Sequence, residues 1–223
     1  MLKRTALAVL VIAALPMQAY ADEGKFRLDA HASLLGLGLE LAAPLSEKYT
    51  ARVGFNTLKL SGNTDSGGLS YKGDLKLSSV TALMDWRPWN GVTHLTAGVI
   101  FNSNKLELNA TATSGTVYSI NGFNYTAATG DAINTTVDFN KVAPYLGIGW
   151  SGQPKKKGFS FSSDIGILFQ GSPKATVTAT GAWTAAGGKT VTDLVADAQS
   201  QLNSDLSNFK YYPVVSIGIG YTF

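Results

Sequence analysis

The sequence contains no cysteine. Disulfide bonds, thiolate metal ligands and cysteine nucleophiles are therefore all excluded for this chain. Charged residues are also few, at 15% of 223 residues, and only two histidines are present. A chain of this length fits one ordinary domain. Backbone pairing and apolar packing must therefore hold its fold together.

Long apolar runs are absent after the N-terminus, which has basic residues, the apolar run Ala6–Leu15 and a small-x-small site ending at Ala21. This pattern predicts a signal peptide over residues 1–21 and one domain over 22–223, because about ten apolar residues are too few to span a bilayer. Removing the peptide's two basic residues lowers the formal net charge from +3 to +1. Such a chain gives no reason to expect nucleic acid as a partner.

The clearest positive signal is strand-like alternation. In segment 215–223 every second residue is apolar and the residues between are small or polar. The same alternation occurs in Tyr49–Asn56, His94–Asn102, Val142–Trp150 and Phe159–Gln170. A secreted β-sandwich would show this pattern too, but segments of this kind also suit tilted bilayer crossings of about 9–11 residues. We predict an all-β fold, an antiparallel transmembrane β-barrel.

The sequence identifies seven strands, and we expect an eighth. Segments 26–42 and 69–87 also alternate, but their parity shifts near Leu34–Leu35 and near Ser78–Val80. We interpret these shifts as β-bulges. Bacterial barrels of one chain have even strand numbers, so an eighth strand is expected in the N-terminal segment or within 117–126.

The connections are sorted by length. Short turns at Pro44–Lys48, Pro88–Gly91 and Ser151–Gly158 alternate with a smaller loop, Gly62–Gly68, and with the long polar segments Asn109–Asn134 and Gly171–Ser207. This sorting is typical of outer-membrane barrels, with short periplasmic turns and long outer loops. Within the first long segment, the dipeptide Asn121-Gly122 predicts a hairpin, which would project outside the membrane if it is not the eighth strand.

One helix is predicted over residues 190–206. Its apolar residues recur at helical spacing, and Thr190 or Thr192 is available as the N-cap. We expect it to lie across the barrel mouth or on the membrane interface. A packed cap is favoured over a partner-binding helix.

Aromatic residues gather beside the short turns and at the C-terminus. They are predicted to form a ring at the inner membrane interface, where amphipathic rings are favoured: Tyr49, Trp86, Trp89, Trp150, Phe159, Tyr221 and Phe223.

Several polar and charged residues share the parity opposite the apolar face. The candidates for lining the barrel interior are Glu40, Arg52, Asn56, Asp85, His94, Tyr145 and Asp164. Opposite charges placed there should pair, because an unpaired buried charge is costly. Such a network would either line a path for small solutes or plug the barrel. No spaced ligand cluster accompanies His94, so neither a metal nor a cofactor is expected.

Three stretches carry a family resemblance: Gly36–Glu40, Phe139–Trp150 and Phe209–Phe223. They resemble proteobacterial small outer-membrane β-barrel proteins of the broad OmpW/OmpA-like type. The resemblance implies a Gram-negative outer membrane, with its lipids and lipopolysaccharide as surroundings. It also implies insertion by the barrel-assembly machinery, which reads a terminal aromatic strand that Tyr221 and Phe223 match. It implies no catalytic residue.

These observations favour an integral outer-membrane protein that is structural or a narrow, porin-like channel, and not an enzyme. A surface-binding module built on the long loops is the alternative. A lipid-modifying esterase is the least favoured, because His31, Ser33 and nearby Glu40 match only the His-x-Ser spacing of outer-membrane lipid A deacylases. That spacing would place both side chains on one face of a strand, as a base and a nucleophile require.

Overall fold

The computed structural model describes residues 26–89, 91–113, 115–152, 157–185 and 188–223, and the predicted signal peptide lies outside them. Among these residues, no helix is both long and apolar enough to cross a membrane. The strands are β1 (Arg27–Ser33), β2 (Gly36–Pro44), β3 (Tyr49–Ser66), β4 (Leu69–Trp86), β5 (Thr93–Asn102), β6 (Lys105–Ala112), β7 (Thr116–Ile120), β8 (Phe123–Ala127), β9 (Ala132–Asp138), β10 (Val142–Ser151), β11 (Gly158–Phe169), β12 (Lys174–Thr180), β13 (Thr184–Ala185) and β14 (Tyr211–Thr222), and the helix is α1 (Val191–Leu206).

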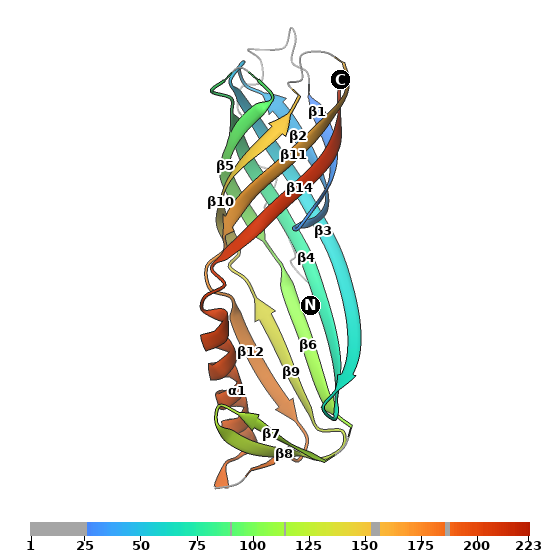
Figure 1. The fold of residues 1–223 in the computed structure, drawn as a ribbon, viewed down its shortest axis with the longest axis vertical. Coiled ribbons are helices and arrows are strands. Elements are labelled where there is room, and N and C mark those ends of the chain that lie inside the picture. The colour runs from blue at the N-terminus through green and yellow to red at the C-terminus, as the bar shows by residue number, and fades with distance from the viewer. Residues whose placement is uncertain (1–25, 90, 114, 153–156, 186–187) are drawn as a thin grey trace, which may run out of the picture.

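Eight strands close into a ring in the order β1, β2, β3, β4, β5, β10, β11 and β14, with β14 paired back to β1 (Figure 1). All neighbouring pairs in this ring are antiparallel. The predicted eight-stranded antiparallel barrel with one helix is confirmed. We call the end with the short turns and the C-terminus the inner end, and the opposite end the outer end.

The eighth strand comes from the N-terminal segment, where the predicted bulge at Leu34–Leu35 is wrong. These two residues form the turn between β1 and β2. The two strands pair from Ser33 opposite Gly36 to Arg27 opposite Ala42. Gly36 has a φ of 115°, which an L side chain rarely adopts. The turn is tied to the barrel wall, because the Leu34 amide donates to the Val215 carbonyl at 3.1 Å. The parity shift thus marks a chain reversal.

The predicted bulge near Ser78–Val80 is also wrong. Strand β4 pairs with β3 without a break, but its other partner changes there from β6 to β5. Inside the barrel, β4 turns apolar residues such as Met84 outward, whereas beyond it Leu69 packs against an apolar core. The apolar face changes side because the strand leaves the barrel wall.

The prediction that segments 109–134 and 171–207 are long polar loops is wrong. They form strands and a helix, which fold into a unit beyond the outer end (Figure 1). The outer halves of β3 and β4 continue into a sheet with β6, β9 and β12, and β7, β8 and β13 form a second sheet. Together with α1, these elements are called the head. The predicted Gly62–Gly68 loop is likewise strand up to a tight turn at Gly67 and Gly68, both with positive φ. The predicted Asn121-Gly122 hairpin is confirmed as the β7–β8 turn.

Helix α1 lies along β12, so the first of its two predicted positions, across the barrel mouth, is wrong (Figure 1). Its first turn has a capping box, in which Thr190 and Asp193 bond reciprocally. The side chains of Gln199 and Asn203 bond backbone groups of β12 at Val177 and Ala175. The helix therefore covers a sheet edge that would otherwise present unpaired backbone groups.

The head has an apolar core of its own: Ala112, Tyr125, Ala127, Trp183 and Leu194. The Tyr125 hydroxyl donates to Asp197 at 2.6 Å, and the Lys189 ammonium lies 2.7 Å from the same carboxylate oxygen. Burial raises the pKa of Tyr125 to about 12, and the bonds from Lys189 and Tyr125 lower the pKa of Asp197.

These shifts predict how head stability depends on pH. The pKa of Tyr125 is raised above its ordinary value of 10.0. The stability that its protonated hydroxyl gives to the folded head is therefore complete below pH 10 and declines toward pH 12. The pKa of Asp197 is lowered, so its contribution is present above 3.8 and is lost as the pH falls through the lowered pKa. Urea unfolding of the wild type and Tyr125→Phe between pH 9 and about 12 checks the alkaline limb. The variant should decline less, and equal decline would contradict the assignment.

Candidate functional site

The candidate site is the polar interior of the barrel. Strand alternation turns every second side chain inward, and small residues at facing positions give the long ones room. At Gly149 an added Cβ would collide with the carboxylate of Asp164 and the ring of His94. A glycine is therefore required for these two side chains to meet.

Arg52 is the centre of this interior and is 4% exposed. Its guanidinium lies 3.1 Å from Glu40, 3.0 Å from Asp85 and 3.0 Å from Asp164. Both terminal nitrogens bond Asp164, which is the fork geometry that favours arginine over lysine. One cation thus holds three buried carboxylates from three different strands.

His94 extends the network and is fully buried. Its Nε2 lies 3.1 Å from Asp164, and its Nδ1 lies 3.4 Å from the hydroxyl of Ser151. Among the residues that the structure describes, no group of three or more His, Asp or Glu side chains is arranged to hold a metal ion. His94 therefore lies among hydrogen-bonding partners.

Two further buried arginines lie toward the inner end and were not among the sequence candidates. Arg27 pairs with Asp29 at 2.6 Å and donates to the Gly152 carbonyl. Arg87 donates to the hydroxyls of Thr50 and Ser151. Both could have been found, because each shares the parity of an inward residue two positions away in its segment.

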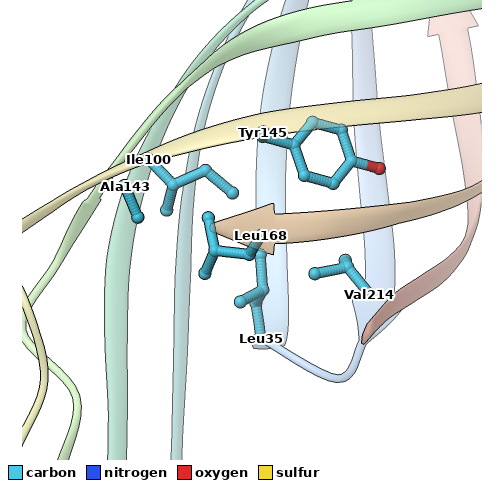
Figure 2. Packing of buried hydrophobic residues seen from close by; sticks show 6 residues of the cluster. All are labelled: Leu35, Ile100, Ala143, Tyr145, Leu168 and Val214. Carbon is cyan, nitrogen blue, oxygen red and sulfur yellow. The ribbon is translucent and has the colours of Figure 1, made fainter. Parts of the chain in front are cut away.

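An apolar cluster closes the interior toward the outer end, where side chains from several strands and the β1–β2 turn point at one another (Figure 2). Its members are Leu35, Ile100, Ala143, Tyr145, Leu168 and Val214. We call it the apolar plug. Tyr145, predicted to line the lumen, lies within it and is 3% exposed.

Between the charged network and the apolar plug, a cavity of about 40 Å³ remains. Asn56, the last of the predicted lumen residues, lines it and bonds His31 at 2.6 Å. A water needs at least about 10–15 Å³ measured in this way, so the cavity holds only a few waters. Within the described residues, this space between the network and the plug has no room for a solute.

The residues compared with lipid A deacylases are engaged elsewhere. His31 bonds Asn56, and the Ser33 hydroxyl bonds the carbonyl of Gly36 and the amide of Leu35 within the β1–β2 turn. Both side chains line the small cavity, and Glu40 pairs with Arg52.

The aromatic residues predicted to lie at the inner interface all lie at the inner end. Tyr49, Trp86, Trp89, Trp150 and Phe159 are exposed there, with Tyr49 directly opposite Trp86. Tyr221 makes edge contacts with both Phe159 and Phe223, at 5.0 and 5.2 Å between ring centres. A second group at the outer end was missed by sequence reasoning: Phe101, Phe169, Phe209 and Tyr211, all exposed. Its strand-end positions are the signal that could have found it.

No protein-family model matches the chain. No curated protein matches it either. Among solved structures, it is similar to CarO and CarO2 of Acinetobacter baumannii. Each is 20% identical, with TM-scores of 0.60 and 0.62, and the match covers 89% and 90% of this chain, and 97% and 98% of theirs. A major outer membrane protein from Thermus thermophilus is 13% identical over 90% of this chain and 99% of that one, with a TM-score of 0.47. The likeness to the two Acinetobacter proteins shows a shared fold, and the OmpW/OmpA-like resemblance stays a prediction.

Proposed function

We propose that this chain is an integral outer-membrane protein whose barrel is a closed anchor and whose head is displayed at the cell surface. The observation that carries the proposal is the filled interior, where a buried ion network and the apolar plug leave about 40 Å³. The proposal includes no enzymatic activity.

The outer wall of the barrel supports membrane insertion. Large apolar side chains are exposed around it, among them Leu39, Val53, Leu146, Phe161 and Ile217. Soluble proteins rarely expose such a contiguous apolar surface. Aromatic side chains border this band at both ends, which is the pattern of barrels in outer membranes. Outer-membrane lipids and lipopolysaccharide are therefore the proposed surroundings, and Tyr221 and Phe223 the proposed signal for the assembly machinery.

Three measurements test the closed anchor. Purified protein should migrate differently in detergent gels before and after boiling, and it should require detergent to stay in solution. In planar bilayers the wild type should give no stepwise conductance, because no solute path is open. Solubility in plain buffer would remove the membrane assignment, whereas regular current steps would remove the closed state.

A narrow channel is the second candidate function. It is favoured by the three carboxylates around Arg52 and by the cavity beside them, which would join to the outside if the apolar plug moved. Current steps in the wild type that change in Arg52→Ala would establish the channel. Steps that appear only in Ile100→Ala/Leu168→Ala would instead identify the plug as a permanent seal.

A further inference from the structure

We propose that the head carries a binding site for the phosphorylated sugar headgroup of lipopolysaccharide, on its outward face directly beyond the barrel. The site consists of a row of lysines and a polar groove next to it. The inference rests on the proposed function, because it requires the barrel to stand in an outer leaflet that contains this lipid.

The lysine row consists of Lys59, Lys76 and Lys105 on β3, β4 and β6. Lys59 lies directly opposite Lys76, and Lys76 directly opposite Lys105, so all three share one face of the sheet. That face is the continuation of the barrel's outer wall, because Lys59 has the parity of exposed Phe55. Like charges directly opposite each other destabilise a sheet. Ion pairs with Glu107 and Asp74 offset part of this repulsion, and Asp138 lies directly opposite Lys105 on the next strand, β9.

The polar groove begins one residue pair further out, and its volume is about 590 Å³. The side chains that line it include Ser61, Asn63, Lys72, Asp74, Asn109 and Asn134. Eight of the twelve lining residues, including all of these, have the parity of the lysine row, whereas Gly62, Gly73, Leu108 and Thr135 have the opposite parity. The groove therefore lies mainly on the outward face.

The lysine ammoniums are held beside this groove by two carboxylates. Lys76 lies 2.5 Å and Lys105 3.6 Å from Glu107, and Lys59 lies 3.7 Å from Asp74. Together with Asp138, which lies directly opposite Lys105, the row and the groove contain four lysines and three carboxylates, so the surface has a net charge of +1. Its ammonium, amide, hydroxyl and carboxylate groups offer the donors and acceptors that phosphates and sugar hydroxyls bind.

The order of these groups along the strands matches the order of groups in the lipid. Moving outward along β3, apolar Phe55 is followed by Thr57, then Lys59, then the groove residues Ser61 and Asn63. Acyl chains, phosphorylated sugars and core sugars follow one another in the same direction in an outer leaflet. Basic residues next to a bilayer attract anionic headgroups by about 1 kcal/mol each. Position and chemistry therefore select the same ligand.

The test uses the full mature protein in detergent, titrated calorimetrically with deacylated lipopolysaccharide, which retains the phosphorylated sugars but has no acyl chains. Wild type should bind it saturably, and the triple variant Lys59→Gln/Lys76→Gln/Lys105→Gln should bind about tenfold more weakly or worse. The matched control is Lys48→Gln/Lys155→Gln/Lys157→Gln, which removes the same charge from the two short turns predicted at Pro44–Lys48 and Ser151–Gly158 and should bind within about twofold of wild type. Removing the phosphates from the deacylated lipopolysaccharide should weaken its binding to the wild type by about as much as the triple substitution weakens binding of the intact probe.

A second variant, Asn63→Trp, fills the groove without changing charge and should also weaken binding. If the triple variant no longer shows the gel shift of a folded barrel, the binding measured with Asn63→Trp tests the site in its place. Absence of saturable binding by the wild type, equal binding by the triple and control variants, or equal affinity for inorganic phosphate would each overturn the site. These outcomes differ from failure of the proposed function, which appears as solubility of the wild type without detergent.

Discussion

Replacing Arg52 by leucine is expected to destabilise the barrel by about 3–5 kcal/mol, because the change leaves buried carboxylates without their cation. Glu40, Asp85 and Asp164 all lie within 3.1 Å of its guanidinium, and all are nearly inaccessible to water. The measurement is urea unfolding in detergent micelles or lipid vesicles, followed by the gel shift between folded and unfolded forms. The midpoint of Arg52→Leu should fall well below that of the wild type.

The matched control is Lys59→Leu. Lys59 also pairs with a carboxylate, but its side chain is 61% exposed and the ion pair is 3.7 Å long. Exposed pairs contribute little because solvent screens them. If both leucine variants unfold at the same urea concentration, the buried network contributes no more to barrel stability than an exposed ion pair does.

A rescue variant separates lost charge balance from lost packing. Arg52→Met combined with Glu40→Gln, Asp85→Asn and Asp164→Asn removes the cation and the three carboxylates together. Buried ion networks can often be replaced by uncharged groups of similar size without loss of stability. The rescue variant should therefore unfold closer to the wild type than Arg52→Leu does.

Strand alternation predicted the barrel wall well because its physical cause is local. A period of two follows from backbone geometry alone, and Val215, Ile217 and Ile219 are all exposed on the outer wall as their parity indicates. Helix 190–206 was predicted for the same reason, and the structure begins it one residue later at Val191.

Parity shifts could not be interpreted locally. At Leu34–Leu35 the chain turns without an asparagine or proline, and at Ser78 the strand continues straight but changes partner. Both give the same sequence signal, an apolar residue on the unexpected parity. Only the pairing of distant segments distinguishes a turn from a change of surroundings.

The interior network was likewise predictable only in its local part, the inward direction of each side chain. Parity placed Arg52, Asp85 and Asp164 on inward-facing positions, but their meeting depends on the register of β3, β4 and β11. Asp164 lies 112 residues from Arg52 in the sequence. The sheet of the head that contains β6, β9 and β12 was missed for a different reason: these strands are rich in Thr, Ala and Asn, so their apolar face is too weak to distinguish them from polar loops.

The head and the barrel each have an apolar core, and the two share no residue. Leu194 on α1 is fully buried in the head core, so Leu194→Ala should cost about 2–5 kcal/mol there and leave the barrel folded. Limited proteolysis measures the difference: the variant should be cut within 113–131 faster than the wild type, while its barrel keeps the heat-dependent gel shift. Thr192→Ala, an exposed change on the same helix, is the control and should be cut at the wild-type rate. If Leu194→Ala instead loses head and barrel together, the two cores unfold as one cooperative unit, and a barrel that anchors a separately folded head is the wrong description.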